Sequence, residues 1–136
     1  MVDLPAKNPC GSCPYRRDCP SGLWHESEYD KLREFDLPTQ EQSGRVFLCH
    51  QTPAKLCAGW VGTHDMDESM AMRIGMIHGL TPEDVAAVRA YTTDVPLFGS
   101  GEEAYQHGMR EYENPRPETA RVVKKIATKR KDLRYS

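Results

Sequence analysis

The sequence predicts a small α+β, mainly helical domain, with a metal-stapled, loop-rich N-terminal half and a helical C-terminal half. Three observations predict this fold class. Prolines and glycines punctuate residues 1–24, where they interrupt helices and strands. Apolar residues at helical spacing recur further along the chain. Five cysteines stand in a chain that has few aliphatic residues.

The chain length and the composition together predict a modest core. A chain of 136 residues allows one domain. Leu, Ile, Val and Phe make up only 23 of these residues, and the net charge is −2. A core this small needs an additional constraint to remain folded. We expect residues 1–114 to form a cysteine-rich metal-binding domain and residues 115–136 a basic C-terminal helix.

The first half is expected to contain one helix and one short strand. Ser27 is a candidate cap for a helix from about Glu28 to Asp36, where Tyr29, Leu32 and Phe35 have helical spacing. The run 45–48 (Arg-Val-Phe-Leu) has β character. Residues 50–62 are expected to be a loop.

Four helices are predicted in the second half. One spans about Asp67 to His78 and ends at Gly79. The next starts at Thr81, which is followed by proline and two acids. Ser100 can cap the third, and the last runs from about Pro117 to Arg134.

The cysteines give the most specific functional signal. Cys10 and Cys13 are separated by Gly and Ser, which allow a backbone turn that aims both sulfurs at one ion. Cys49 and Cys57 flank a loop after the expected strand. Two such pairs suit a four-sulfur site for Zn²⁺, with a [4Fe–4S] cluster as the alternative. Unligated cysteines and a redox thiol pair remain open.

Two further residues are possible alternate ligands. Cys19 is the fifth cysteine, and His50 directly follows Cys49. If Cys19 were a ligand, one of the other cysteines would be spare.

Three enzyme-like patterns fit less well. The Pro-Cys-x-x-Cys at residues 9–13 matches half of a zinc deaminase signature, but no histidine precedes it. A thioredoxin-like motif should follow a strand, whereas this one lies near the chain start among prolines. Residues 64–68 (His-Asp-Met-Asp-Glu) could form a hydrolytic or hard-metal cluster, although acids there also suit a helix N-terminus.

Basic charge is segregated at the C-terminus. Residues 110–136 carry a net charge of +5 and residues 1–109 a net charge of −7. The segregation suggests a nucleic acid or an acidic protein surface as partner at this helix, and a plain solvated helix face is the alternative. Its candidate contacts are Lys124, Lys125, Lys129, Arg130, Lys131 and Arg134.

No membrane span and no signal peptide are expected. No apolar run approaches the roughly 20 residues that a membrane helix needs, and the first nine residues lack an apolar segment. We therefore expect a cytoplasmic protein with reduced thiols.

Two resemblances accompany these patterns. Residues 10–19, with Pro14 and Arg16, are similar to part of the WhiB-like iron–sulfur regulators of actinobacteria. The segments CGSCPYRRDCPSGLWHESEY, VFLCHQTPAKLCAGW and VPLFGSGEEAYQHGM resemble an uncharacterised family of small proteins from actinobacteria and their phages, catalogued as a domain of unknown function.

The second resemblance spans roughly residues 8–110 and bears on the ligand set. It implies shared cysteines at Cys10, Cys13, Cys49 and Cys57, while the position of Cys19 is often not cysteine. A phage origin would place the protein in the host cytoplasm. With four protein ligands and no open position, we expect an interaction or regulatory module rather than an enzyme. A metal-dependent enzyme remains the further alternative, and no specific small-molecule substrate is inferred.

Overall fold

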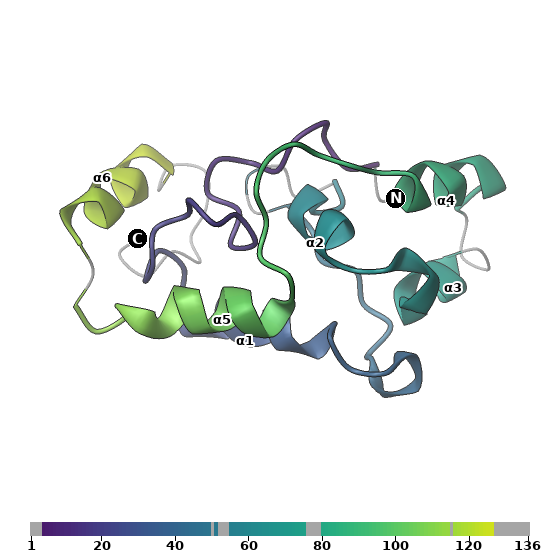
Figure 1. Cartoon of the computed structure of the whole chain (residues 1–136), viewed down its shortest axis with the longest axis horizontal. Coiled ribbons are helices and arrows are strands. Elements are labelled where there is room, and N and C mark those ends of the chain that lie inside the picture. Colours follow the sequence, from purple (N-terminus) through teal and green to yellow (C-terminus); the bar gives the residue numbers. More distant parts are fainter. Residues whose placement is uncertain (1–3, 50, 52–54, 76–79, 115, 127–136) are drawn as a thin grey trace.

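The chain folds into short helices connected by long loops (Figure 1). This computed structural model describes residues 4–49, 51, 55–75, 80–114 and 116–126. The helices are α1 (Glu26–Glu34), α2 (Ala58–Thr63), α3 (Met70–Gly75), α4 (Pro82–Arg89), α5 (Gly101–Arg110) and α6 (Pro117–Ile126), with 3-10 turns η1 (Thr39–Glu41) and η2 (Met66–Glu68). The prediction of a mainly helical protein is confirmed.

The β part of the fold prediction is wrong for the described residues. The run 45–48 forms no strand there. It contributes one isolated antiparallel bridge, between Leu48 and Leu56, and the other bridge pairs Arg16 with Leu97. A single bridge satisfies few backbone groups, so the segment is stabilised by packing rather than by a sheet.

Helices α1 and α5 lie side by side (Figure 1). Asp36, just after α1, accepts hydrogen bonds from the backbone N–H groups of Gly101 and Glu102, both at 2.8 Å. These groups belong to the first turn of α5 and have no partner within the helix. The carboxylate thus caps α5 and fixes the end of α1 against it.

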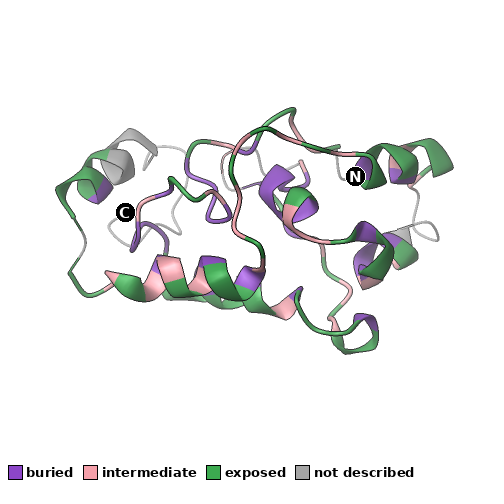
Figure 2. Cartoon of the chain, in the orientation of Figure 1, coloured by how far each residue is buried: buried purple, intermediate pink, exposed green. Residues whose placement is uncertain are grey.

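The N-terminal loop is the centre of the core rather than a surface segment. Figure 2 shows buried backbone along this early part of the chain. Tyr15, Leu23 and Trp24 are fully buried, together with Tyr29 and Leu32 of α1. The Phe98 N–H donates to the Tyr15 carbonyl at 2.9 Å, which ties the loop to the segment before α5. Aromatic residues therefore replace the aliphatic side chains that the composition lacks.

Several predicted helix boundaries are corrected. The N-cap of α1 is His25, whose ring accepts from the Ser27 N–H, so the helix begins earlier than expected and Ser27 lies within it. Residues 50–62 are not all loop, because α2 begins after Cys57. The helix expected at Asp67–His78 is divided into η2 and α3, with Ser69 between them, and residues 76–79 lie outside the described part.

Other helix starts are confirmed. Thr81 and Asp84 form a capping box at the start of α4. Ser100 caps α5 by accepting from the Glu103 N–H. Helix α6 begins at Pro117 as predicted, and the part of the predicted helix after Ile126 lies outside the described residues. Among the described residues, no helix combines the length and apolarity needed to cross a membrane.

The contact between α1 and α5 depends on a glycine. A Cβ at Gly108 would overlap the ring of Tyr29. That ring cannot move freely, because its hydroxyl accepts from the N–H groups of Leu23 and Trp24 at 2.9 and 3.0 Å. The close approach of the two helices therefore requires a residue without a side chain at this position.

We expect Gly108→Ala to destabilise the protein by about 1–3 kcal/mol, because overpacking outweighs the better helix propensity of alanine. Urea unfolding of the variant measures this cost. Gly99→Ala is the control, since its Cβ would meet Glu103 only at ordinary contact distances of 3.5 Å and beyond. A Gly108→Ala variant as stable as wild type would contradict the packing described.

Candidate metal centre

The first cysteine pair lies on a tight turn. The Cys13 N–H donates to the Cys10 carbonyl at 3.0 Å, and the Arg16 N–H donates to the Cys13 carbonyl at the same distance. The first bond closes a four-residue turn with Gly11 and Ser12 at its centre. Cys13 is buried, while Cys10 is only partly covered.

Cys49 and Cys57 lie on the two antiparallel segments that the Leu48–Leu56 bridge joins. The Cys49 N–H donates to the Lys55 carbonyl at 2.9 Å, and the Cys57 N–H donates to the Phe47 carbonyl at 2.8 Å. Because side chains alternate along extended backbone, Cys49 and Cys57 project to the same face. This arrangement explains how a spacing of seven intervening residues brings the two cysteines together.

The two pairs meet. The Sγ atoms of Cys13 and Cys57 are 3.6 Å apart, although the residues are 44 positions apart in sequence. The Cys10 thiol interacts by hydrogen bonding with both Cys13 and Cys49. All five cysteines are free thiols rather than disulfides. The structure thus brings the four predicted cysteines together as a chain of contacts, from Cys49 through Cys10 and Cys13 to Cys57.

These contacts between thiols do not by themselves form a complete metal-binding site. Within the part of the molecule that is described, no three His, Cys, Asp or Glu side chains stand in an arrangement ready to hold a metal ion. The thiols instead bond to one another in pairs. The predicted ligand set is therefore assembled in space, while a bound metal remains a proposal.

Proximity of the thiols alters their acidity. The hydrogen bond with Cys13 raises the pKa of Cys10, the one with Cys49 lowers it, and burial adds to the rise. The pKa of Cys13 lies well above its ordinary value. Its hydrogen bond with Cys10 lowers that pKa, but the contact with Cys57 and burial outweigh this effect. Without a cation, these crowded sulfurs retain their protons.

Backbone N–H groups are directed at two of the sulfurs. The Trp60 N–H lies 3.5 Å from the Cys57 Sγ, which caps α2. The Tyr15 N–H hydrogen-bonds to Cys13 and lowers its pKa. Such donors stabilise thiolate over thiol.

Gly59, which the sequence analysis did not single out, supports the site together with Ser12. A Cβ at Gly59 would overlap the Cys13 Sγ and approach the Tyr15 Cβ to 2.8 Å, so α2 needs glycine here. Ser12 is buried, and its hydroxyl accepts from the Gln51 side chain at 2.7 Å. This bond joins the first cysteine turn to the loop between Cys49 and Cys57. In the sequence, the small residues Ala58 and Gly59 after Cys57 were the feature that could have predicted the close approach of α2 to Cys13.

Of the two possible alternate ligands, the structure describes only Cys19. Cys19 is buried, and its thiol donates to the Ser12 carbonyl at 3.5 Å, a contact with backbone oxygen rather than sulfur. His50 lies outside the described residues.

The arginines beside the first cysteine pair and the residues of the acidic cluster have partners elsewhere. Arg16 forms a two-pronged ion pair with Asp18 at 2.8 Å, and Arg17 donates to the Leu97 carbonyl. In the acidic cluster, Asp65 caps η2 and His64 bonds to Asp36. Asp65 therefore serves a helix start, as the simpler interpretation held, while the Asp67 carboxylate pairs with Arg89 and that of Glu68 accepts from Thr39. Of the basic tail, Lys124 and Lys125 fall within α6 but their side chains are not described, while Lys129, Arg130, Lys131 and Arg134 lie outside the described residues.

Comparison with known protein families identifies the chain. Residues 5–130 match a family model described as a family of unknown function, DUF6283. The chain belongs to this family. The matched range includes all five cysteines and most of the basic tail. Comparisons with curated proteins and with solved structures gave no match.

The burial of Cys19 predicts that the stability of the fold depends on pH. Burial raises the pKa of Cys19 well above its ordinary value of 9.0, and ionisation of the neighbouring Cys13 and Cys10 would raise it further. The unfolded chain ionises at the ordinary value while the folded chain retains the proton. The contribution of Cys19 to the free energy of unfolding is therefore fully present below pH 9.0 and is lost as the pH rises above this value.

We expect wild type to lose more stability than Cys19→Ala when the pH is raised from about 8 to about 10.5. Urea unfolding of both proteins at each pH measures the difference. Comparing the change within each protein removes the constant cost of the cavity that alanine leaves. An equal loss in both would show that Cys19 does not titrate in this way.

Proposed function

We propose that this DUF6283 protein is a small metal-binding module in which Cys10, Cys13, Cys49 and Cys57 hold one structural Zn²⁺. The observation that carries the proposal is the meeting of the two cysteine pairs from distant parts of the chain. The distance of 3.6 Å between the Cys13 and Cys57 sulfurs supports it. A tetrahedral ion with Zn–S bonds of ~2.3 Å sets its sulfurs roughly 3.7 Å apart.

Binding of Zn²⁺ would require changes in the protonation and orientation of the four thiols. The thiols must lose their protons and turn from their paired contacts toward a common point. Cys10 is the ligand least covered by protein, so it offers the entry path. A divalent cation replaces the protons that the crowded thiols retain, and the Trp60 and Tyr15 N–H groups stabilise the resulting negative charge.

A structural role suits the composition and the fold. The free energy of metal binding becomes free energy of folding when the unfolded chain has no formed site. The ligands join the N-terminal loop to the residues that precede α2, two segments that no sheet connects among the described residues. With four protein ligands there is no open position for substrate. We therefore assign a binding or regulatory role in the cytoplasm rather than catalysis.

An iron–sulfur cluster is the alternative for the same cysteines. In a [4Fe–4S] cluster each cysteine binds a different iron, so the sulfurs stand further apart than around one ion. The short distance between Cys13 and Cys57 favours a single ion. Iron bound alone by four thiolates would have the same geometry, and elemental analysis after purification without oxygen distinguishes it from zinc.

We expect wild type to contain one tightly held metal ion per chain, and Cys10→Ala to lose most of it together with thermal stability. Cys19→Ala is the matched control, because it removes a buried thiol outside the four-sulfur group and should retain the metal. Elemental analysis and thermal melts provide the readouts. A folded Cys10→Ala variant with full metal content would overturn the proposal.

Two glycines give a second test that leaves every cysteine in place. Gly59→Ala adds a Cβ that overlaps the Cys13 sulfur, whereas Gly11→Ala adds one with nothing within 4 Å. We expect Gly59→Ala to release metal to a chelator much faster than wild type and Gly11→Ala to match wild type. Equal release from all three proteins would count against the proposed ligand role of Cys13.

A further inference from the structure

The four sulfurs of the candidate centre form two contacts between the first cysteine turn and the second pair of cysteines. The Sγ atoms of Cys13 and Cys57 are 3.6 Å apart, and these residues are separated by 44 positions in sequence. The Cys10 thiol hydrogen-bonds to Cys49 in the same way. Two thiols in contact need only the loss of two electrons and two protons to become a disulfide.

The geometry of the second pair limits how the four thiols can be joined. In the antiparallel pairing around the isolated bridge, Cys49 and Cys57 are diagonal neighbours rather than opposite each other. Diagonal positions are about 7–8 Å apart, whereas the Cα atoms of a disulfide are roughly 4.4–6.8 Å apart. A disulfide between Cys10 and Cys13 would therefore leave both other thiols without a partner. Cys10 with Cys49 and Cys13 with Cys57 is the pairing that uses every thiol and follows the contacts.

Access from solvent differs among the cysteines. Cys10 is partly exposed, and the other four cysteines are buried. Cys13 and Cys57 are only 1% and 3% exposed. Oxidation of a thiol follows its exposure, so a reagent from solution reacts first at Cys10. Because Cys10 contacts both Cys13 and Cys49, the oxidised sulfur is within reach of two other thiols.

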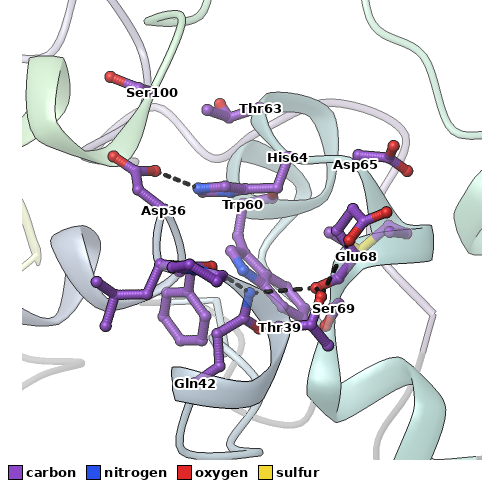
Figure 3. Close-up of a pocket in the computed structure, with 14 residues that line it drawn as sticks. Asp36, Thr39, Gln42, Trp60, Thr63, His64, Asp65, Glu68, Ser69 and Ser100 are labelled. Carbon is purple, nitrogen blue, oxygen red and sulfur yellow. Dashed lines mark hydrogen bonds and ion pairs between the residues drawn. The ribbon is translucent and has the colours of Figure 1, made fainter.

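Helix α2 has an anchor that involves no sulfur. At its far end the His64 Nε2 bonds to Asp36 at 2.8 Å, the contact drawn in Figure 3. In its middle Trp60 packs against Phe35, with the ring centroids 5.3 Å apart. These contacts keep the start of α2, and with it Cys57, beside the first cysteine turn when no metal is bound.

We propose that hydrogen peroxide converts the centre into two disulfides, Cys10–Cys49 and Cys13–Cys57, and thereby expels the metal. The expulsion of metal rests on the proposed zinc centre, whereas the two disulfides do not. The disulfides join the same segments as the metal. The centre is thus a reversible switch between a reduced, metal-bound state and an oxidised, cross-linked state.

The reaction takes place in two rounds, each of which begins at Cys10. Peroxide oxidises the Cys10 sulfur to a sulfenic acid and releases water, and attack by Cys49 forms the disulfide and releases a second water. Cys13 then attacks Cys10, and Cys57 attacks Cys13. This exchange moves the disulfide inward and returns Cys10 and Cys49 to thiols, which react with a second peroxide.

The sum of the two rounds balances. Two peroxide molecules take four electrons and four protons from four thiols, and the products are two disulfides and four water molecules. From the metal-bound state the four protons come from solvent, because the ligands are already thiolates. A dithiol reductant reverses both disulfides by exchange.

Peptide mapping of the full-length protein tests the pairing. Protein purified without oxygen is treated with two molecules of hydrogen peroxide per chain, and its remaining thiols are alkylated after unfolding. Trypsin places Cys49 and Cys57 on different peptides, and Cys10 and Cys13 together on a third. We expect fragmentation to show Cys10 joined to Cys49 and Cys13 joined to Cys57. Cys19 should be alkylated, because its thiol faces backbone carbonyls.

Two further readouts follow from the same reaction. A zinc-sensitive dye should report one ion released per four thiols lost, and dithiothreitol should restore all four thiols. With a chelator in every sample, Cys10→Ala should lose the thiols of Cys13 and Cys57 about tenfold more slowly than wild type. Cys19→Ala is the matched control and should react at the wild-type rate. If Cys10→Ala does not fold, the map of the wild-type protein decides.

Other results overturn the proposal. These are a final product with a Cys10–Cys13 disulfide, disulfides between chains, a sulfinic acid at Cys10 without a disulfide, or an unchanged rate in folded Cys10→Ala. The two proposals fail separately. Protein that is free of metal before treatment but forms both expected disulfides would contradict the zinc centre alone. Zinc-bound protein whose four thiols survive peroxide would contradict the switch alone.

Discussion

The contact between sulfurs from the start and the middle of the chain is the constraint on which the structure depends. Cys13 and Cys57 touch across 44 residues, and Cys10 reaches Cys49. The described residues contain no sheet that would otherwise join these two segments. Much of the core around them comes from loop residues such as Tyr15, Trp24 and Phe47. These thiols therefore join two distant parts of a chain that has few aliphatic residues.

Helix α2 connects this centre to the rest of the molecule. Cys57 caps its beginning, Trp60 lies in its middle, and His64 follows its end. His64 then binds Asp36, which caps α5 and anchors the end of α1. A helix of six residues has little stability alone. Its position is instead fixed from both ends, by the Cys57 sulfur at its start and by the hydrogen bond between His64 and Asp36 at its end.

The sequence predicted what local chemistry determines. The capping residues Thr81 and Ser100 and the buried stripe of Tyr29 and Leu32 follow from side-chain types at fixed spacings. The gathering of the four cysteines was also predictable, since two pairs of thiols from distant segments suit one four-sulfur site. Tertiary context decided the remainder. The run before Cys49 pairs with Leu56 through a single bridge and forms no strand. The segment after Cys57 is a helix that packs closely on Cys13, and Gly59 permits this approach. The pairing of Asp36 with His64 had no local signal.

The nature of the centre can be measured directly. X-ray absorption at the metal edge, on full-length protein purified without added metal, reports the ligand atoms around the ion. The account predicts a zinc edge with four sulfur neighbours at ~2.3 Å and no lighter ligand. A shell of nitrogen and oxygen, metal–metal scattering from a cluster, or protein that is folded and free of metal would contradict it.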